Sequence, residues 1–122
     1  MNFNRTPEFK KDLKKLQKKW RTLENDLNKA EQFVQLIYTN SEMYESFVNG
    51  PNATVISTSN LQEVMKMRLE CTSPGAKGKA RIVFVFARID GEIILLEIYS
   101  KSEKDREDST RIHDYLANNQ LN

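Results

Sequence analysis

Four basic side chains and one aromatic ring fall in extended-looking segments of the C-terminal half of the chain: Lys66, Arg68, Arg81, Tyr99 and Lys101. In an extended segment, alternate residues point to the same face. Lys66 and Arg68 therefore share a face, as do Tyr99 and Lys101. Cations neutralise phosphates, and an aromatic ring can stack on a base. If the segments are neighbouring strands, the five side chains converge on one sheet face that suits a single-stranded nucleic acid. The same alternation is also typical of any half-exposed strand.

A second cluster of positive charge lies at the start of the chain. Residues 1–21 contain eight basic residues and two acidic ones. This imbalance favours a phosphate or an acidic protein as partner, although a solvated helix face would have the same composition. If the partner is a nucleic acid, the basic residues expected to contact its phosphates are Lys10, Lys11, Lys14, Lys15, Lys18 and Lys19 here, with Lys79 and Lys104 beside the extended segments.

The length and composition exclude several classes of protein and of site. With 122 residues, the chain is expected to form one domain over 1–122. The single cysteine, Cys71, excludes an internal disulfide, and with a single histidine, His113, it leaves no set of zinc ligands. The longest apolar run, Ile93 to Leu96, is far shorter than the roughly 20 residues of a membrane helix. We therefore expect a cytoplasmic protein with no membrane partner, no metal and no cofactor.

The N-terminal half predicts helices that cover a sheet. Asn2 to Arg5 allows a leading edge strand, and Thr6-Pro7-Glu8 has the cap and first-turn residues of a helix start. Two alternatives fit the segment after this start: one continuous helix, or a helical hairpin that breaks near Arg21-Thr22, with Thr22 as the second N-cap. A single long rod would not pack along so small a domain, which favours the hairpin. Apolar residues recur in steps of three and four, the spacing of a helix, at Phe9, Leu13, Leu16, Trp20, Leu23, Leu27, Ala30, Val34 and Ile37.

The C-terminal half predicts strands joined by turns. Residues 39–60 are rich in loop formers, with a helical turn at Met43 to Val48 and a strand near Val55. Three strands come next, at Glu63 to Leu69, Ala80 to Ala87 and Ile93 to Tyr99, and then a thinly apolar helix at Glu103 to Leu116. On the last strand, Ile94, Leu96 and Ile98 should face away from Tyr99. The predicted fold is α+β, with the helical hairpin packed on one face of a small antiparallel sheet, a short C-terminal helix, and the other face partly open.

Several segments together resemble toxins of the RelE/ParE superfamily, and within it the mRNA interferases of the HigB/RelE type. The runs Phe9 to Leu16 and Leu23 to Leu27 resemble the N-terminal helices of these toxins. Val64 to Leu69 resembles a strand that carries their cation pair. Gly75 to Phe84 resembles the glycine-lysine turn that leads to a strand arginine, and Ile93 to Lys104 resembles the last strand and its exit. Only about residues 39–62 lie outside this likeness.

The resemblance implies a bacterial type II toxin that cleaves mRNA in the ribosomal A site without a metal. In that reaction the 2′-hydroxyl attacks the adjacent phosphate, which leaves a 2′,3′-cyclic phosphate and a 5′-hydroxyl. By position, Lys66 and Arg68 match the strand cation pair of the family, and Arg81 matches the arginine that stabilises the transition state. The implied partners are a cognate antitoxin protein and mRNA on the bacterial ribosome.

Departures from the family pattern affect the site. RelE has a lysine, a candidate general base, where this chain has Arg68, and arginine is a poor base. Lys66 is then the best candidate base, on the expectation that the neighbouring Arg68 and Arg81 lower its pKa, and Glu63 is the next. Ser102 stands where RelE has an arginine, which Lys101 or Lys104 could replace. Asp108 stands where RelE has a tyrosine, so that Tyr99, or Tyr115 if the alignment slips, would stack on the base; Lys79-Ala80 replaces part of the usual Gly-Gly-Tyr.

Two other functions stay open on the sequence. A ParE-like gyrase poison would act through the N-terminal helices, but such toxins lack the cations that Lys66, Arg68 and Arg81 provide. A catalytically degraded relative would only bind an antitoxin, and the changes at Ser102 and Asp108 favour it.

Overall fold

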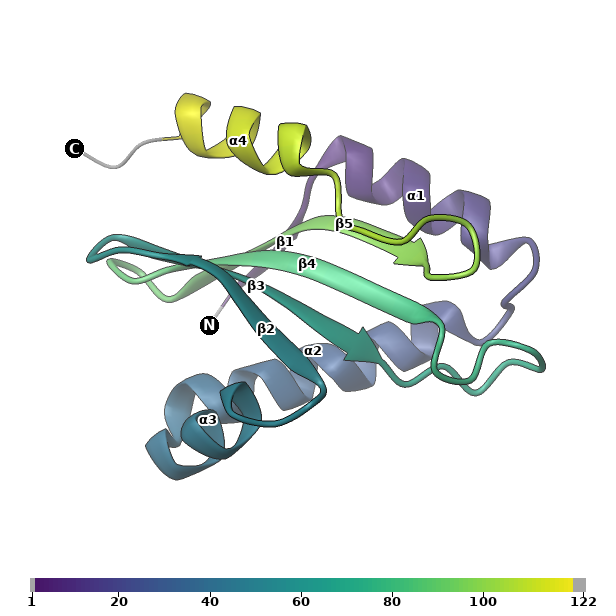
Figure 1. The fold of residues 1–122 in the computed structure, drawn as a ribbon, viewed down its shortest axis with the longest axis horizontal. Coiled ribbons are helices and arrows are strands. Elements are labelled where there is room, and N and C mark those ends of the chain that lie inside the picture. The colour runs from purple at the N-terminus through teal and green to yellow at the C-terminus, as the bar shows by residue number, and fades with distance from the viewer. Residues whose placement is uncertain (1, 120–122) are drawn as a thin grey trace.

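The computed structural model describes residues 2–119, which form four helices and a five-stranded sheet (Figure 1). The elements are β1 (Phe3–Arg5), α1 (Pro7–Gln17), α2 (Leu23–Thr39), α3 (Ser41–Val48), β2 (Ala53–Thr58), β3 (Gln62–Leu69), β4 (Ala80–Ala87), β5 (Glu92–Ser100) and α4 (Ser109–Asn118). The strand order is β1-β5-β4-β3-β2, with β1 parallel to β5 and the other neighbours antiparallel. The predicted α+β class is confirmed. No helix within residues 2–119 has the length and apolar character to cross a membrane.

The helical periodicity of the N-terminal half corresponds to buried positions. All nine apolar residues from Phe9 to Ile37 at that spacing are buried. Thr6 caps α1, because its hydroxyl accepts the Phe9 N–H at 3.2 Å. The chain is not helical at residues 18–22, where buried Trp20 fills the corner between α1 and α2. Thr22 precedes α2, but its side chain makes no capping hydrogen bond; its hydroxyl instead contacts Asp26 and Ser73.

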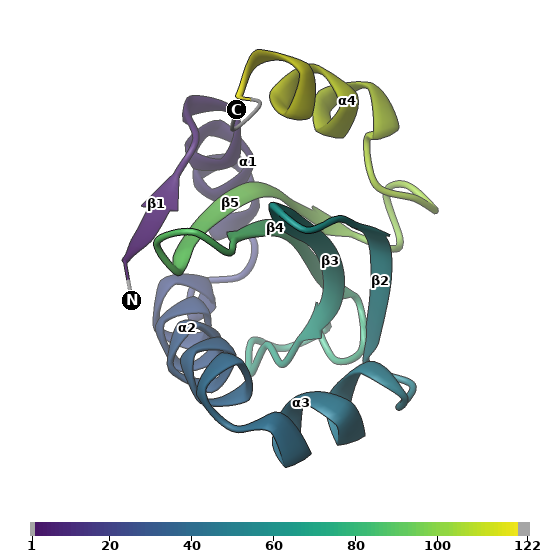
Figure 2. The same ribbon diagram turned by 90° about the vertical axis from the view of Figure 1, so that its left-hand side faces the viewer.

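Each face of the sheet has its own apolar cluster. Met65 and Phe84 point toward the helices α1, α2 and α3, whereas Val83 and Ile94 point toward α4. Figure 2 shows the sheet as a curved layer with α2 and α3 on one side and α4 on the other. We call the first side the helix-pair face and the second the α4 face. The α4 face was expected to be partly open; Ile112 of α4 instead packs on it and is buried.

A β-bulge in β5 changes which residues share a face. Val83 lies opposite Glu97 while Phe84 lies opposite Leu95, so Leu96 has no partner of its own on β4. An extra residue in one strand reverses the alternation beyond it. Leu96 and Ile94 therefore lie with Tyr99 on the α4 face, whereas Ile98 lies on the helix-pair face with Ile93 and Leu95. The prediction that Ile94, Leu96 and Ile98 share a face is wrong for this reason.

The terminal helix begins later than the sequence predicts. Residues 101–108 are non-helical, and α4 begins at Ser109, with Asp108 as its cap through the Arg111 N–H at 3.0 Å. Arg111 also donates to Asp12 of α1 at 2.6 Å and to the Leu96 carbonyl at 2.9 Å. These bonds add to the thin apolar contact of the helix. We call residues 101–108 the connector.

Candidate nucleic-acid interface

Three of the predicted site residues form a row across the sheet. Arg68 on β3 lies opposite Arg81 on β4, which lies opposite Tyr99 on β5. Side chains of directly opposed residues on one face lie roughly 5 Å apart at their Cβ atoms. Tyr99 belongs to the cluster of the α4 face, so the row lies on that face. The structure therefore brings two guanidinium groups and a phenol together at one end of the sheet.

Lys66 lies beside this row on the same face. It is two residues before Arg68 on β3, opposite Val83. Its ammonium forms an ion pair with Glu107 of the connector, with Nζ and Oε1 2.8 Å apart. An ammonium in an ion pair has no lone pair with which to accept a proton. The sequence predicts only arginines around Lys66, whereas the structure also places the carboxylate of Glu107 there. An electrostatic role therefore suits Lys66 better than that of a base.

Arg81 is the least exposed cation of the group. Its side chain is buried, at 9% exposure, and Nη1 donates to the carbonyls of Gly78 and Ala80 at 2.9 and 3.1 Å. Burial, followed by the charge of Arg68, lowers the pKa of Arg81. Within residues 2–119, neither Arg68 nor Arg81 forms a salt bridge with a carboxylate. Two neighbouring cations without a counter-ion are stabilised by any anion that binds between them.

The glycine-lysine turn before β4 holds Arg81 in place. Gly75 and Gly78 have φ of 80° and 74°, which favour glycine because it has no Cβ. The turn is bonded to the start of α2: Thr72 donates its N–H to Asp26 at 3.1 Å, and Ser73 accepts the Thr22 N–H at 3.1 Å. The carbonyl of Gly78 is thereby fixed as an acceptor for the guanidinium.

Tyr99 is covered rather than available for stacking. Its side chain is 5% exposed, and the ammonium of Lys104 lies 5.1 Å from the ring centroid. Among the residues that the structure describes, its buried hydroxyl has no hydrogen-bond partner. Burial, and then the charges of Glu107 and Glu97, raise the pKa of Tyr99 to about 12, so the hydroxyl keeps its proton at neutral pH. A base could stack on this ring only after the connector moves.

The two lysines after β5 lie in the connector. Lys101 follows the end of the strand, and its ammonium donates to the carbonyl of Asp105 at 3.0 Å. It does not extend the row of Arg68, Arg81 and Tyr99, because β5 ends at Ser100. Lys104 forms a salt bridge with Glu97, whose carboxylate is buried and also accepts the Asp108 N–H at 2.8 Å. These contacts hold the connector against the α4 face.

Glu63 does not belong to the site. Its alternation with Met65 places it on the helix-pair face, where it is 2% exposed. Its carboxylate accepts hydrogen bonds from Tyr38, at 2.6 Å, and from Tyr44. The expectation that Glu63 is the next candidate base is therefore wrong. Its carboxylate also forms a salt bridge with Arg88, at 3.8 Å. Its role in the structure is to join α2 and α3 to the sheet.

The N-terminal lysines form a separate exposed surface. One of them, Lys19, forms a salt bridge at 2.8 Å with Glu103 of the connector and lies over the Trp20 ring. The end of α1 therefore adjoins the connector. The exposed lysines of this surface are Lys10, Lys11, Lys14, Lys15, Lys18 and Lys19, and Lys79 in the turn before β4 is also exposed.

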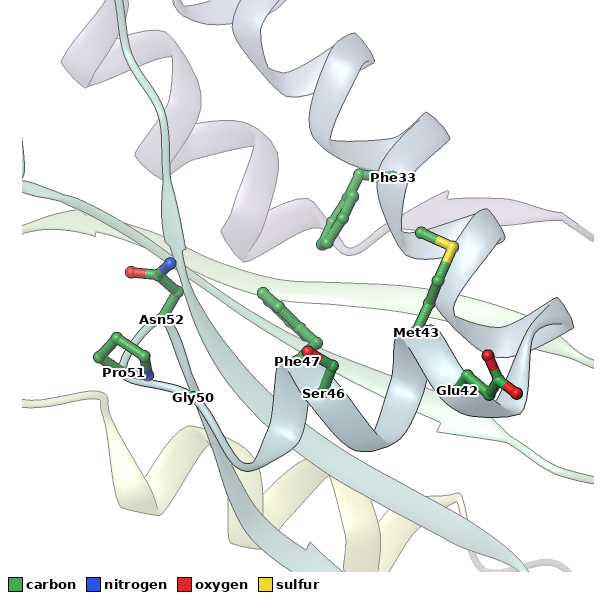
Figure 3. Close-up of a pocket in the computed structure, with 8 residues that line it drawn as sticks. All are labelled: Phe33, Glu42, Met43, Ser46, Phe47, Gly50, Pro51 and Asn52. Carbon is green, nitrogen blue, oxygen red and sulfur yellow. The ribbon is translucent and has the colours of Figure 1, made fainter.

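Two hollows lie away from the cationic row. One, between α2, α3 and the turn at Gly50–Asn52, is mainly apolar; Phe33 and Phe47 meet edge to face there, with ring centroids 4.9 Å apart (Figure 3). The other lies between the start of α1 and α4. No group of His, Cys, Asp or Glu suited to a metal occurs within residues 2–119.

Glu107 is the site residue that the sequence pattern does not single out. It falls in a stretch of mixed charge that reads as helix, and nothing local shows that it meets Lys66 across 41 positions. Burial raises its pKa, but the hydrogen bond and charge of Lys66 outweigh this effect, so the pKa of Glu107 is lowered.

Of the two departures from the RelE pattern, Ser102 bonds to Ser100 and Asp108 caps α4, so neither supplies a cation or a ring.

Comparison with known proteins identifies the fold. No protein-family model matches the chain, and no curated protein matches it. A chain in the crystal structure of the archaeal RelE–RelB complex from Pyrococcus horikoshii OT3 is similar, with a TM-score of 0.50 and 14% identity. The match covers 82% of this chain and 93% of that one. At this identity the likeness shows the fold, which is RelE-like.

Proposed function

We propose that the chain is the toxin of a type II toxin-antitoxin system and an endoribonuclease that cleaves mRNA in the ribosomal A site without a metal. The RelE-like fold supports this proposal, together with the resemblance of the sequence segments to RelE-type toxins. The observation that carries it is the Arg68–Arg81 pair, which has no carboxylate partner within residues 2–119 and lies beside Lys66 on one sheet face. In this proposal the toxin domain spans 1–122 and works in the cytoplasm.

The cations fit the charge that the reaction builds. The 2′-oxygen forms a bond to phosphorus, the bond from phosphorus to the 5′-oxygen breaks, and the phosphoryl oxygens gain negative charge on the way. A water molecule accepts the proton of the 2′-hydroxyl, and the 5′-oxygen gains a proton. Arg68 and Arg81 can bind the phosphoryl oxygens, and this stabilisation increases as charge develops. Lys66 in its ammonium form can stabilise, or protonate, the leaving 5′-oxygen.

The other predicted surfaces have roles in the same proposal. The exposed lysines of α1, with Lys79 and Lys104, would bind ribosomal RNA and orient the site toward the message. The α4 face would also suit acidic side chains of a cognate antitoxin, because Arg68 and Arg81 have no carboxylate partner within residues 2–119. The solved RelE relative is a RelE–RelB complex, which supports an antitoxin as partner.

Primer extension on messages from cells that briefly express the chain tests the proposal. We expect cuts inside translated codons with the wild type, and none with Arg81→Ala. Arg88→Ala is the matched control, because Arg88 follows the end of β4, is exposed and contacts Thr58, Ser59 and Glu63 instead of the row. Growth arrest with intact messages would contradict the proposal and favour a gyrase poison. Absence of both arrest and cuts would favour a relative that only binds an antitoxin.

A further inference from the structure

A carboxylate already lies on the cationic face. Glu107 reaches Lys66 from the connector, and its side chain is mostly buried there. The connector is held by two further ion pairs, Glu103 with Lys19 and Lys104 with Glu97. In this conformation the anion nearest to the proposed site therefore belongs to the protein.

The carboxylate leaves most of the site unsatisfied. Glu107 pairs with Lys66 only, while Arg68 and Arg81 have no salt bridge within residues 2–119. Arg81 instead bonds to two backbone carbonyls. A carboxylate on one short side chain cannot reach all three cations, whereas a phosphate has several oxygens to share among them.

The hydroxyl of Tyr99 gives an independent indication. It is buried on the same face, next to Arg81 in the row, and has no hydrogen-bond partner among the described residues. A buried hydroxyl without a partner costs free energy, and such groups in native structures commonly mark functional sites. Because Tyr99 keeps its proton, the hydroxyl can donate to an anion, and this suits it better than the stacking role expected from the sequence.

We propose that Lys66, Arg68, Arg81 and the hydroxyl of Tyr99 form a seat for one phosphate group, and that Glu107 is the resident anion that this phosphate displaces from Lys66. The identity of the ligand as an RNA phosphate rests on the proposed function. The connector would shift when the phosphate binds, since exposed ion pairs such as Glu103 with Lys19 hold it only weakly. Glu107 thus lowers the affinity of the free protein for RNA.

Binding of a fluorescein-labelled 2′-O-methyl hexaribonucleotide, which has no free 2′-hydroxyl and cannot be cleaved, tests this seat by anisotropy. We expect Glu107→Gln to tighten binding about three- to tenfold, because the competing carboxylate is gone. Asp105→Asn is the matched control, because it removes the same charge from the same connector and its carboxylate forms no salt bridge within residues 2–119. The control should change binding by less than about twofold.

Tyr99→Phe tests the second half of the seat. It keeps the ring and removes only the hydroxyl, so it should weaken binding about two- to fivefold when added to Glu107→Gln. Unfolding curves of all variants show whether each keeps the fold. Should Glu107→Gln not fold, a titration of the wild-type chain with inorganic phosphate followed by NMR replaces it, and the amides of Lys66 and Glu107 should shift together.

Three results would overturn the seat: binding by Glu107→Gln that equals or falls below the wild type, an equal gain from Asp105→Asn, or phosphate shifts that miss both residues. The outcome is separable from that of the proposed function. Tighter binding by Glu107→Gln without any cleavage of messages supports the seat and contradicts the nuclease. Cleavage of messages by the wild type, with no tighter binding by Glu107→Gln, supports the nuclease and contradicts the seat.

Discussion

The two faces of the sheet each bury a polar group near the candidate site or opposite it, and the two groups, Glu63 and the hydroxyl of Tyr99, differ in their hydrogen bonding. On the helix-pair face, the carboxylate of Glu63 receives hydrogen bonds from Tyr38 and Tyr44. On the α4 face, the hydroxyl of Tyr99 has no partner within residues 2–119, and Arg81 bonds only to carbonyls. A satisfied polar cluster fixes a fold, whereas unused hydrogen-bonding capacity and unpaired charge are the features of a site that awaits a ligand. The difference supports the proposal that one face serves stability and the other binding.

The largest effect on stability should come from Glu63. Replacing it with alanine leaves two partly buried tyrosine hydroxyls without their acceptor, which should lower the free energy of unfolding by about 2–4 kcal/mol. Urea unfolding measures this loss. Tyr44→Phe removes one of the two bonds and should cost less, about 1 kcal/mol. A loss for Glu63→Ala no greater than that for Tyr44→Phe would contradict the assignment of stability to this face.

Arg81 should show the opposite behaviour. Arg81→Lys keeps a positive charge but loses the planar fork that can bind two phosphoryl oxygens. We expect cleavage of ribosome-bound mRNA to fall about hundredfold, with a change in unfolding free energy below about 1 kcal/mol. Single-turnover cleavage and urea unfolding on the same preparation measure both. Comparable losses of folding and cleavage would show that Arg81 serves the fold.

Asp26 links the two faces through the turn that holds Arg81. Burial raises its pKa, but the hydrogen bonds from Thr22, Thr72 and Cys71 outweigh burial, so the pKa of Asp26 lies below its ordinary value of 3.8. A carboxyl group with a lowered folded-state pKa stabilises the fold fully above its unfolded-state pKa, and this contribution is lost as the pH falls through the folded-state value.

We therefore expect unfolding free energy to drop below about pH 4, with a shallower drop in Asp26→Asn. The variant should lose about 1–2 kcal/mol at neutral pH. Urea unfolding between pH 2 and pH 7 measures both curves. An identical acid-induced drop in the two proteins would show that Asp26 does not couple to folding.

The lysines of α1 should give the smallest effect. Lys14 and Lys15 are exposed, and neither forms a salt bridge within residues 2–119. The double change to glutamine should leave stability nearly unchanged and reduce the salt dependence of ribosome binding, with the slope of log K against log[salt] falling by about 1–2. If these lysines form only a solvated helix face without a binding role, the double variant will show the same slope as the wild type.

Periodic features of the fold were predictable from the sequence, and features set by single contacts were not. The nine apolar residues from Phe9 to Ile37 recur at helical spacing, and each is buried. Strand β4 has the bounds predicted for it, Ala80–Ala87. The bulge at Leu96 carries no local signal, since neither glycine nor proline marks it, and it reverses the predicted face of two residues. The start of α4 depends on a cap at Asp108 that a run of charged residues hides.

The candidate site was likewise predictable only where it depends on strand alternation. The faces of Lys66, Arg68 and Arg81 follow from alternation, because β3 and β4 pair without a shift beside them. Glu107 could not be found this way, because it meets Lys66 through a connector whose path depends on tertiary contacts. The burial of Tyr99 also depends on those contacts, so sequence alone could not separate a stacking ring from a hydrogen-bond donor.

The most direct test of the central claim uses the purified chain and mRNA bound to ribosomes, with the ends of the products mapped. The account predicts a 2′,3′-cyclic phosphate and a 5′-hydroxyl at cuts in the A-site codon, no cuts without ribosomes, and loss of the cuts with Arg81→Lys. Intact mRNA on ribosomes, or cuts that Arg81→Lys leaves unchanged, would contradict the claim that the α4 face is the site of RNA cleavage.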